Sequence, residues 1–344
     1  RYCTAYSNLW SAGIWISGGQ NGVIEHSVAY NNACINIWAW NAINVTMRYC
    51  EAFRGRPPRD AGGFDIDWGC ECCTLEYCYS HHNQGPGILA MGSGTADYLG
   101  FPMQSRYNIV RHCIAENDGV SLSVTETFEF GKVYNNLLIA NGKDRVALSV
   151  TGWPLKPYHP DSGGWPSETQ FFNNILVGRQ GATPAWVDDY AATTNKNVFD
   201  HNLYLRLDSK GPLIRWAGRM NGPGYWEAKE GGTISPNDYD ALEAFRKATG
   251  QEAHGLSIDP QFKSPFRGGY GRLPLEDYQL APNSPAVRAG RAVPLTQDWL
   301  SKRAAYLTDT RAESLQIAMA PSDAKEDYWG RKLEPKAGVP VGPG

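Results

Sequence analysis

Two aspartates separated by a single residue offer the clearest chemistry in the sequence. Asp65 and Asp67 lie within residues 62–68, which read Gly-Gly-Phe-Asp-Ile-Asp-Trp. If this stretch is a β-strand, Phe64 and Ile66 point toward a core and both aspartates point outward. Same-face neighbours on a strand are about 6.5–7 Å apart, so the two carboxylates repel each other and one pKa rises. We therefore interpret the pair as a candidate active site; a solvated edge or an acidic calcium-binding patch are the alternatives.

Paired carboxyl groups at this spacing suit the hydrolysis of glycosidic bonds. That reaction needs one protonated acid and one ionised base or nucleophile, and a separation of about 6.5–9.5 Å leaves room for water and inverts the anomeric centre. The spacing of Asp65 and Asp67 falls at the lower edge of this range, so an inverting reaction is expected. The sequence does not assign the acid and base roles within the pair. Glu126 and Asp97 are further carboxylates that neighbouring coils or loops would bring close.

Composition narrows the class of protein. The chain has 344 residues and a net charge of −3, with no strongly basic stretch, which argues against nucleic acid as the main partner. No run of about 18 apolar residues is present, so no membrane span is expected. The 37 glycines and 22 prolines, with few helix-forming runs, favour an all-β fold with many turns. The 12 tryptophans and 18 tyrosines offer flat faces suited to sugar rings.

An internal repeat organises most of the chain. Cys3 begins an incomplete copy of it, and no signal peptide precedes this copy. The complete copies cover residues 23–27, 46–50, 74–78, 109–113, 132–136, 170–174 and 198–202. They recur every 23–38 residues, and the shortest interval equals about one coil of a parallel β-helix, so the longer ones indicate inserted loops. Stacked coils bury a continuous core that no single coil could form, and we predict a solenoid.

A second strand follows in each coil, and its alignment predicts which side chains share a column. The segments are residues 13–17, 34–38, 63–67, 87–91, 119–123 and 145–149. This alignment stacks Ile14 on Ile35 and Phe64 inside the coil. It places Trp15, Asn36 and Asp65 in one outward column, and Trp38 beside Asp67 in the next.

Two ladders of side chains support the register of the first strands. Small residues recur at one bend, namely Cys3, Ser27, Cys50, Cys78, Cys113, Asn136, Asn174 and Asn202. Charges alternate along the adjacent face through Glu25, Arg48, Glu76 and Arg111. Because parallel neighbours lie about 4.8 Å apart, a slipped coil would bring like charges together.

The repeats and the C-terminal motifs resemble the right-handed parallel β-helix proteins of the pectate-lyase-like superfamily. The motifs are residues 248–254, 259–262, 278–280 and 284–286, which look like the closing segment of many secreted members. The resemblance implies a right-handed parallel β-helix and a secreted or periplasmic location. It is not specific for activity, because this fold hosts lyases, hydrolases, epimerases and binding proteins.

We expect one structural domain built in three parts. Residues 1–222 would form the coils that carry the cleft, and residues 223–256 an insertion with a short helix through 239–246 that ends near Gly250. Residues 257–344 would form closing coils and a wrapping tail. Loops at residues 54–62, 92–106 and 151–168 flank the aspartate strand.

A polysaccharide or oligosaccharide is the expected partner. Trp15 and Trp38, on the coils below the acids, would stack on sugar rings, with Asn36 in the same region. The loop arginines Arg54, Arg56 and Arg59 would bind a uronate carboxylate. His82 and Glu126 would contact the substrate or an acid.

No cofactor is expected for a hydrolase. The cysteines at positions 70, 72 and 73 crowd one turn, but a zinc site wants four ligands and a fourth is not evident. We therefore predict mostly buried thiols.

Three other activities remain open. A polysaccharide lyase would use Asp65 and Asp67 as calcium ligands and a loop arginine as base, although no lysine falls beside Asp65 in the outward columns. An alginate-type epimerase would carry an Asp-Pro-His signature, which is absent because Ile66 and Asp67 follow Asp65. A non-catalytic sugar-binding solenoid would share the tryptophan surface.

Overall fold

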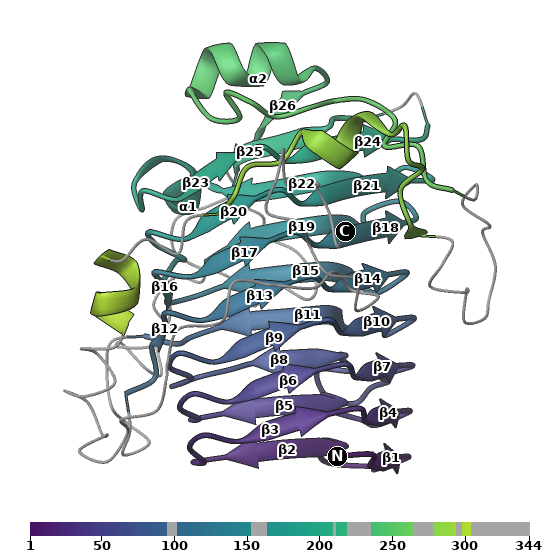
Figure 1. Ribbon diagram of the computed structural model, residues 1–344, viewed down its shortest axis with the longest axis vertical. Helices are drawn as coiled ribbons and strands as arrows, with labels where there is room; N and C mark the ends of the chain where they lie inside the picture. The colour runs from purple at the N-terminus through teal and green to yellow at the C-terminus, as the bar shows by residue number, and fades with distance from the viewer. Residues whose placement is uncertain are drawn as a thin grey trace.

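The computed structural model describes residues 1–94, 102–152, 164–208, 211–218, 235–263, 278–293 and 298–303. The chain winds through one strand of each of three sheets per turn and then starts the next turn on top (Figure 1). Neighbouring strands from successive turns run parallel. The prediction of an all-β right-handed parallel β-helix is therefore confirmed.

The candidate site lies on the longest of the three sheets. Eight of its strands are parallel: β2 (Ile14–Ser17), β5 (Ile37–Trp40), β8 (Phe64–Ile66), β11 (Pro86–Met91), β15 (Val120–Thr125), β19 (Val146–Thr151), β22 (Thr183–Asp188) and β25 (Ile214–Gly218). The ninth strand, β26 (Asn237–Tyr239), pairs antiparallel with β25.

The seven-stranded sheet consists of the seven copies that the sequence repeat predicts. They are β3 (Val23–Glu25), β6 (Thr46–Arg48), β9 (Thr74–Glu76), β13 (Ile109–Arg111), β17 (Lys132–Tyr134), β20 (Gln170–Phe172) and β23 (Val198–Asp200). The register places Glu25 beside Arg48, Arg48 beside Glu76, and Glu76 beside Arg111. The charge ladder is therefore confirmed. Glu76 and Arg111 are more buried than expected, at 8% and 3% exposed.

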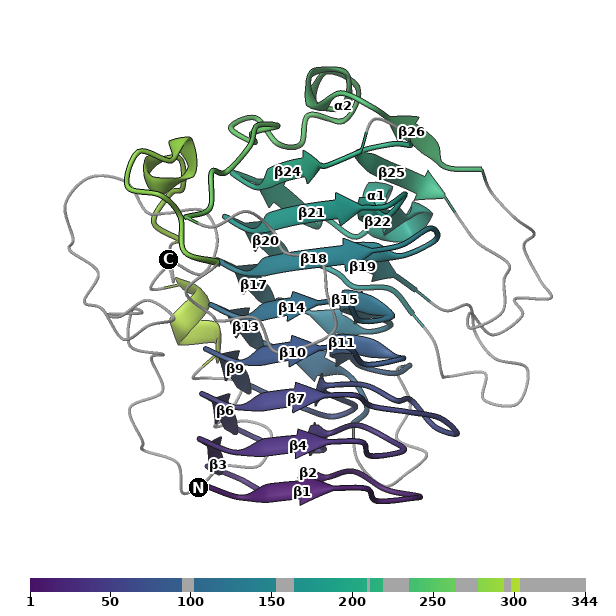
Figure 2. The ribbon, with the colours of Figure 1, turned by 90° about the vertical axis from the view of Figure 1, so that its right-hand side faces the viewer.

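The eight-stranded sheet faces the viewer in Figure 2. Its strands are β1 (Thr4–Tyr6), β4 (Val28–Tyr30), β7 (Glu51–Phe53), β10 (Tyr79–His81), β14 (Ile114–Glu116), β18 (Leu137–Asn141), β21 (Ile175–Arg179) and β24 (Leu203–Arg206). Tyr278, Leu280 and Ala286 of the tail pack on its outer side against Leu137 and Ile175. A small two-stranded sheet joins β12 (Ser105–Arg106) to β16 (Phe128–Glu129).

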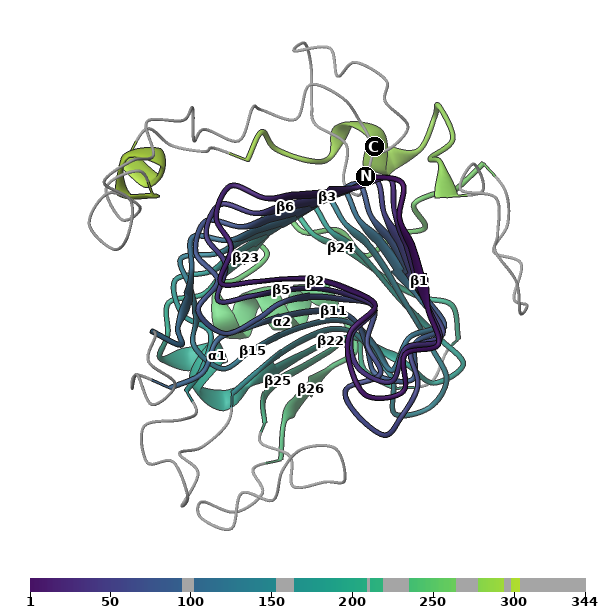
Figure 3. The same cartoon turned by 90° about the horizontal axis from the view of Figure 1, so that it is seen from below.

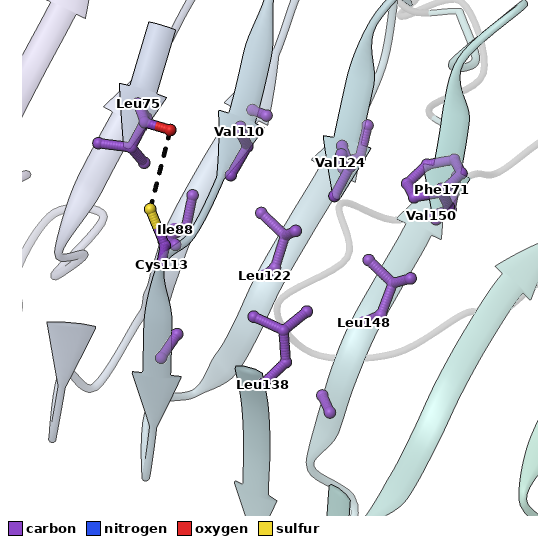
Figure 4. Packing of buried hydrophobic residues seen from close by; sticks show 14 of the residues in the cluster. Leu75, Ile88, Val110, Cys113, Leu122, Val124, Leu138, Leu148, Val150 and Phe171 are labelled. Atoms are coloured by element: carbon purple, nitrogen blue, oxygen red, sulfur yellow. Dashed lines mark hydrogen bonds between the residues drawn. The ribbon is translucent and has the colours of Figure 1, made fainter. Parts of the chain in front are cut away.

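The core fills the space enclosed by the three sheets (Figure 3). Figure 4 shows the layered packing of Ile88, Leu122 and Leu148, which follow one another in register on β11, β15 and β19. Cys113 packs in the same cluster, and its thiol donates a hydrogen bond to the carbonyl oxygen of Leu75 at 3.8 Å. All eight cysteines are free thiols and seven are buried, as predicted.

Helices are few and occupy the ends and corners of the coil. α1 (Asp189–Thr193) follows β22, and residues Pro285–Arg288 form a 3-10 turn in the tail. α2 (Leu242–Thr249) covers the upper end of the core and buries Leu242 and Phe245 (Figure 1). It ends before Gly250, as predicted, but begins later than expected because residues 237–239 pair with β25. None of the described helices has the length and apolar character needed to span a bilayer.

Candidate active site

Asp65 lies on the outward side of β8. Asp67 directly follows this strand and lies on the same side. Phe64 and Ile66 are fully buried in the core, so the predicted inside and outside faces are confirmed. The expected exposure is wrong, because Asp65 is 2% exposed and Asp67 is 7% exposed. In the structure, Asp65 lies between Trp38 of β5 and a leucine of β11, and residues 103–105 pack beside Asp67.

Asp67 is held by two N–H donors. The indole Nε1 of Trp38 donates to Oδ2 at 2.9 Å, and the backbone N–H of Trp68 donates to Oδ1 at 2.6 Å. Burial nevertheless raises the pKa of Asp67 to about 8, and the charges of Asp60 and Glu126 act in the same direction. The two donors favour the ionised form and oppose this rise.

Asp65 lacks this support. Its Oδ1 is buried and has no hydrogen-bond partner among the described residues. Burial, and then the charge of Asp67, raises the pKa of Asp65 well above its usual value. Burial without a donor favours the protonated form of a carboxyl group, because no hydrogen bond stabilises the charge that ionisation would leave. The two neighbouring acids therefore differ in how readily they ionise.

Stacked indole rings lie directly below the acids. Trp15 pairs with Trp38, and Trp38 pairs with Asp65 in the next coil. The Trp15 and Trp38 rings stack with centroids 5.3 Å apart and planes 30° apart. Trp15 is 48% exposed, so the described structure leaves an aromatic face accessible two coils below Asp65, and its stacking on a sugar ring stays a prediction.

The predicted place of Asn36 in this column is wrong. The structure pairs Ile37 with Ile14 and with Phe64, so Asn36 falls in the bend before β5. Its side chain is fully buried and donates to the carbonyl oxygen of Gly62 at 3.1 Å and to Oδ1 of Asn83 at 3.0 Å. Polar side chains at this corner bind the backbone of the bend instead of a substrate. The same one-step slip displaces Ile35 from the predicted core column. It also moves Trp38 from the predicted column of Asp67 into that of Asp65.

The loop arginines and His82 do not gather around the acids as expected. Arg54 lies over the ring of Phe53, at the end of β7 in a different sheet, and Arg56 donates from Nε to the carbonyl oxygen of Asn31 at 3.0 Å. His82 follows β10 at the same corner, and its Nδ1 lies 2.9 Å from Nδ1 of His81. Arg59 is exposed, and its backbone N–H donates to the carbonyl oxygen of Ala33 at 3.0 Å.

Glu126 is fully buried, like the carboxyl pair, and its contact with substrate stays a prediction. It follows β15 with a positive φ of 53°, and its charge raises the pKa of Asp67. Asp97 and residues 153–163 of the 151–168 loop, including Trp153, His159 and Asp161, lie outside the described residues.

A second acidic and aromatic cluster on the same sheet was not predicted from the sequence. Asp188 ends β22, and its Oδ2 lies 3.3 Å from both the backbone nitrogen of Gly152 and the indole nitrogen of Trp165. Burial raises the pKa of Asp188. The Trp165 ring lies 4.4 Å from the ring of Tyr190. The sequence signal for this cluster was Asp188, which stands two residues after Trp186, the outward aromatic residue of this strand.

The three cysteines of the crowded turn are buried thiols. Cys70 donates to the carbonyl oxygen of Ala39 at 3.2 Å, and Cys73 to that of Ala42 at 3.3 Å. Burial raises the pKa of Cys70 well above its usual value and that of Cys72 to about 12. These buried thiols therefore pack against the backbone of the coil, as predicted.

Comparisons with known proteins support the coil architecture. Residues 2–100 match a family model described as a right handed beta helix region. A search of curated proteins finds no match.

Three solved structures are similar to this chain. Pectate lyase Pel9A is 11% identical, covers 83% of this chain and 70% of its own, with a TM-score of 0.46. A mutant of the periplasmic alginate epimerase AlgG is 11% identical over 59% of this chain and 44% of its own (TM-score 0.43). The A-module of the mannuronan C-5 epimerase AlgE4 of Azotobacter vinelandii is 12% identical over 59% of this chain and 54% of its own (TM-score 0.41). The chain spans about half the length of the two epimerases, and its function has to be inferred from the residues of the site.

Proposed function

We propose that the protein is a polysaccharide-acting glycoside hydrolase in which Asp65 is the general acid and Asp67 the general base. The observation that carries this proposal is the unequal hydrogen bonding of two adjacent, buried carboxyl groups. Asp65 lacks a donor at Oδ1 and holds its proton, whereas Asp67 accepts from Trp38 and Trp68 and ionises first. Hydrolysis of a glycoside requires this division between a protonated and an ionised carboxyl group.

The proposed mechanism uses each group once. Asp65 donates its proton to the glycosidic oxygen as the bond to the anomeric carbon breaks. Asp67 removes a proton from a water molecule that attacks the opposite face of the sugar. Trp15 and Trp38 offer their rings to neighbouring sugar units, because the apolar faces of sugars pack well on flat aromatic surfaces. The product anomer would be inverted.

A calcium-assisted polysaccharide lyase is the second candidate. Calcium prefers several ionised oxygen ligands, whereas burial raises the pKa of Asp65 and favours its neutral form, and Asp67 already receives two N–H groups. Within the described part of β5, β8, β11 and β15, the outward side chains beside the acids include no lysine or arginine that could act as base. Arg59 is the cation that a lyase mechanism would have to recruit.

The protein should be incubated with a panel of polysaccharides, with and without a chelator. We expect new reducing ends, no ultraviolet absorbance from unsaturated products, and no effect of the chelator. A general acid or base is typically worth 10²–10⁴-fold in rate, so Asp65→Asn and Asp67→Asn should each lose about that much. Asp60→Asn, which removes an exposed carboxylate nearby, is the matched control and should retain activity.

Other results would overturn the assignment. Unsaturated products that disappear with the chelator would favour the lyase. Binding of a polysaccharide without turnover would favour a sugar-binding solenoid. Retained activity in both Asn variants would move the catalytic site elsewhere, and Asp188 would then be the first carboxylate to replace. A secreted or periplasmic location is part of the same proposal.

A further inference from the structure

A cluster of metal-ligating side chains lies away from the carboxyl pair, at the last strand of the seven-stranded sheet. Asp200 ends β23 and His201 follows it. His254 comes from the segment after α2, which adds one more rung to the coil. Within that segment, the backbone N–H of Glu252 donates to Phe199 and that of residue 256 donates to Asn202, at 2.8 Å each. The fold thus brings together ligand atoms from positions more than fifty residues apart.

Ligand atoms of the three side chains lie close together. Oδ2 of Asp200 lies 2.9 Å from Nδ1 of His254 and 3.7 Å from Nε2 of His201. One ligand atom from each residue lies within 4.8 Å of the others. In a tetrahedral zinc site with bonds of about 2.0–2.1 Å, the ligand atoms are about 3.3 Å apart. The observed separations lie on either side of this value.

Neighbouring groups orient Asp200 and His201 for metal binding, whereas the exposed His254 ring stacks on the His201 ring, with centroids 4.5 Å apart and planes 11° apart, and has to turn to share an ion with it. Nδ1 of His201 lies 3.3 Å from the carbonyl oxygen of Ala289, a contact that places the ring proton on Nδ1 and leaves the lone pair of Nε2 facing Asp200. Oδ1 of Asp200 accepts the backbone N–H groups of His201 at 2.9 Å and His254 at 2.8 Å. Metal-binding histidines and carboxylates are normally oriented by such outer contacts.

The equivalent position in the first coil shows that the arrangement is specific to the last one. Glu25 and His26 occupy the same strand end and the same positive-φ position, with φ of 50° for His26 and 58° for His201. Glu25 is neutralised by Arg48 at 2.7 Å and by Arg1. His26 stacks between two tyrosine rings, about 5 Å away on each side. In the last coil, a second histidine takes the place of the arginine partners.

We propose that Asp200, His201 and His254 bind a borderline divalent transition-metal ion of the Zn²⁺ class. Two imidazoles and one carboxylate suit such ions, whereas Ca²⁺ and Mg²⁺ prefer sites made of oxygen ligands. The His254 side chain is 64% exposed, so water can complete the coordination. The ion would tie the segment that carries His254 to the last coil and so close the end of the solenoid.

Metal binding can be measured on the intact chain with ZnCl₂ alone. We expect one Zn²⁺ per chain by equilibrium dialysis, and a rise in Tm of roughly 4 °C when free Zn²⁺ is about 100 times Kd. CaCl₂ at the same concentrations should leave Tm unchanged. His254→Ala changes an exposed side chain, so it should fold normally and weaken Zn²⁺ binding at least tenfold.

Two further variants make the test decisive. His201→Gln should also weaken Zn²⁺ binding at least tenfold, whereas His26→Ala, the matched control at the same turn position, should bind Zn²⁺ like the wild type. The proposal is overturned if the wild type binds no stoichiometric Zn²⁺, or if His254→Ala and His201→Gln both bind it as tightly as His26→Ala does. Equal stabilisation by calcium would also overturn it.

Discussion

The protonation of Asp65 has a consequence for stability that can be measured without knowing the substrate. Burial raises the folded-state pKa of Asp65 well above its usual value, whereas in the unfolded chain it titrates near 3.9. Between these two values the folded state binds a proton that the unfolded state has lost. The stabilising contribution of this group is therefore fully present below pH ~4 and falls as the pH rises, by about 1.4 kcal/mol per pH unit.

Asp65→Asn should remove this slope, because an amide keeps nearly the same shape and does not ionise. From pH 4 to pH 7 the variant should gain up to about 4 kcal/mol relative to the wild type. For 344 residues the entropy of unfolding is about 0.7 kcal/mol/K, so the difference in Tm should change by roughly 6 °C. An offset that is independent of pH is expected from the amide N–H groups and does not affect this comparison.

The assay is scanning calorimetry of both proteins at half-unit steps from pH 4 to pH 8, with Asp60→Asn as control for the loss of one nearby exposed charge. A difference in Tm that stays constant with pH would mean that Asp65 is ionised in the folded protein. Its assignment as the protonated acid would then be wrong. Asp67→Asn is a poorer probe, because its amide would direct N–H groups at one of the donors Trp38 and Trp68.

Two further predictions concern the site and the bend ladder. Trp38→Phe removes the indole donor from Asp67, a hydrogen bond to a charged group worth about 1.5–3 kcal/mol. The pKa of Asp67 should therefore rise by about 1–2 units and shift the acidic limb of the pH–rate profile upward, while Trp15→Phe, which leaves that bond intact, should not move it. Cys50 is 3% exposed, and its thiol donates to the carbonyl oxygen of Arg48 at 3.2 Å. Cys50→Ser should keep this bond, whereas Cys50→Leu should overpack the bend by about 1–3 kcal/mol; equal Tm values for the two variants would contradict the stacked-bend assignment.

The sequence by itself determined the coil and the side of the strand on which the acids lie. Because coils stack in register, each coil requires the same kind of side chain at equivalent positions. The sequence therefore repeats apolar residues at buried positions such as Ile66. It also repeats charges in the column of Glu25, Arg48, Glu76 and Arg111. The alternation of Phe64, Asp65 and Ile66 is equally local, because successive side chains on a strand point to opposite faces. These features could be predicted because each is set by nearby residues of the same strand or by the repeat from coil to coil.

The tertiary structure alone decided the register at the bends and the environment of the acids. The sequence pattern could not show that Asn36 lies outside the strand, because its place depends on a hydrogen bond that its side chain donates to Asn83, which lies 47 residues away. The burial of Asp65 and the hydrogen bond from the Trp38 indole to Asp67 likewise come from packing between coils. Distance along the chain hides such contacts, and the approach of His254 to Asp200, 54 residues before it, shows this most clearly.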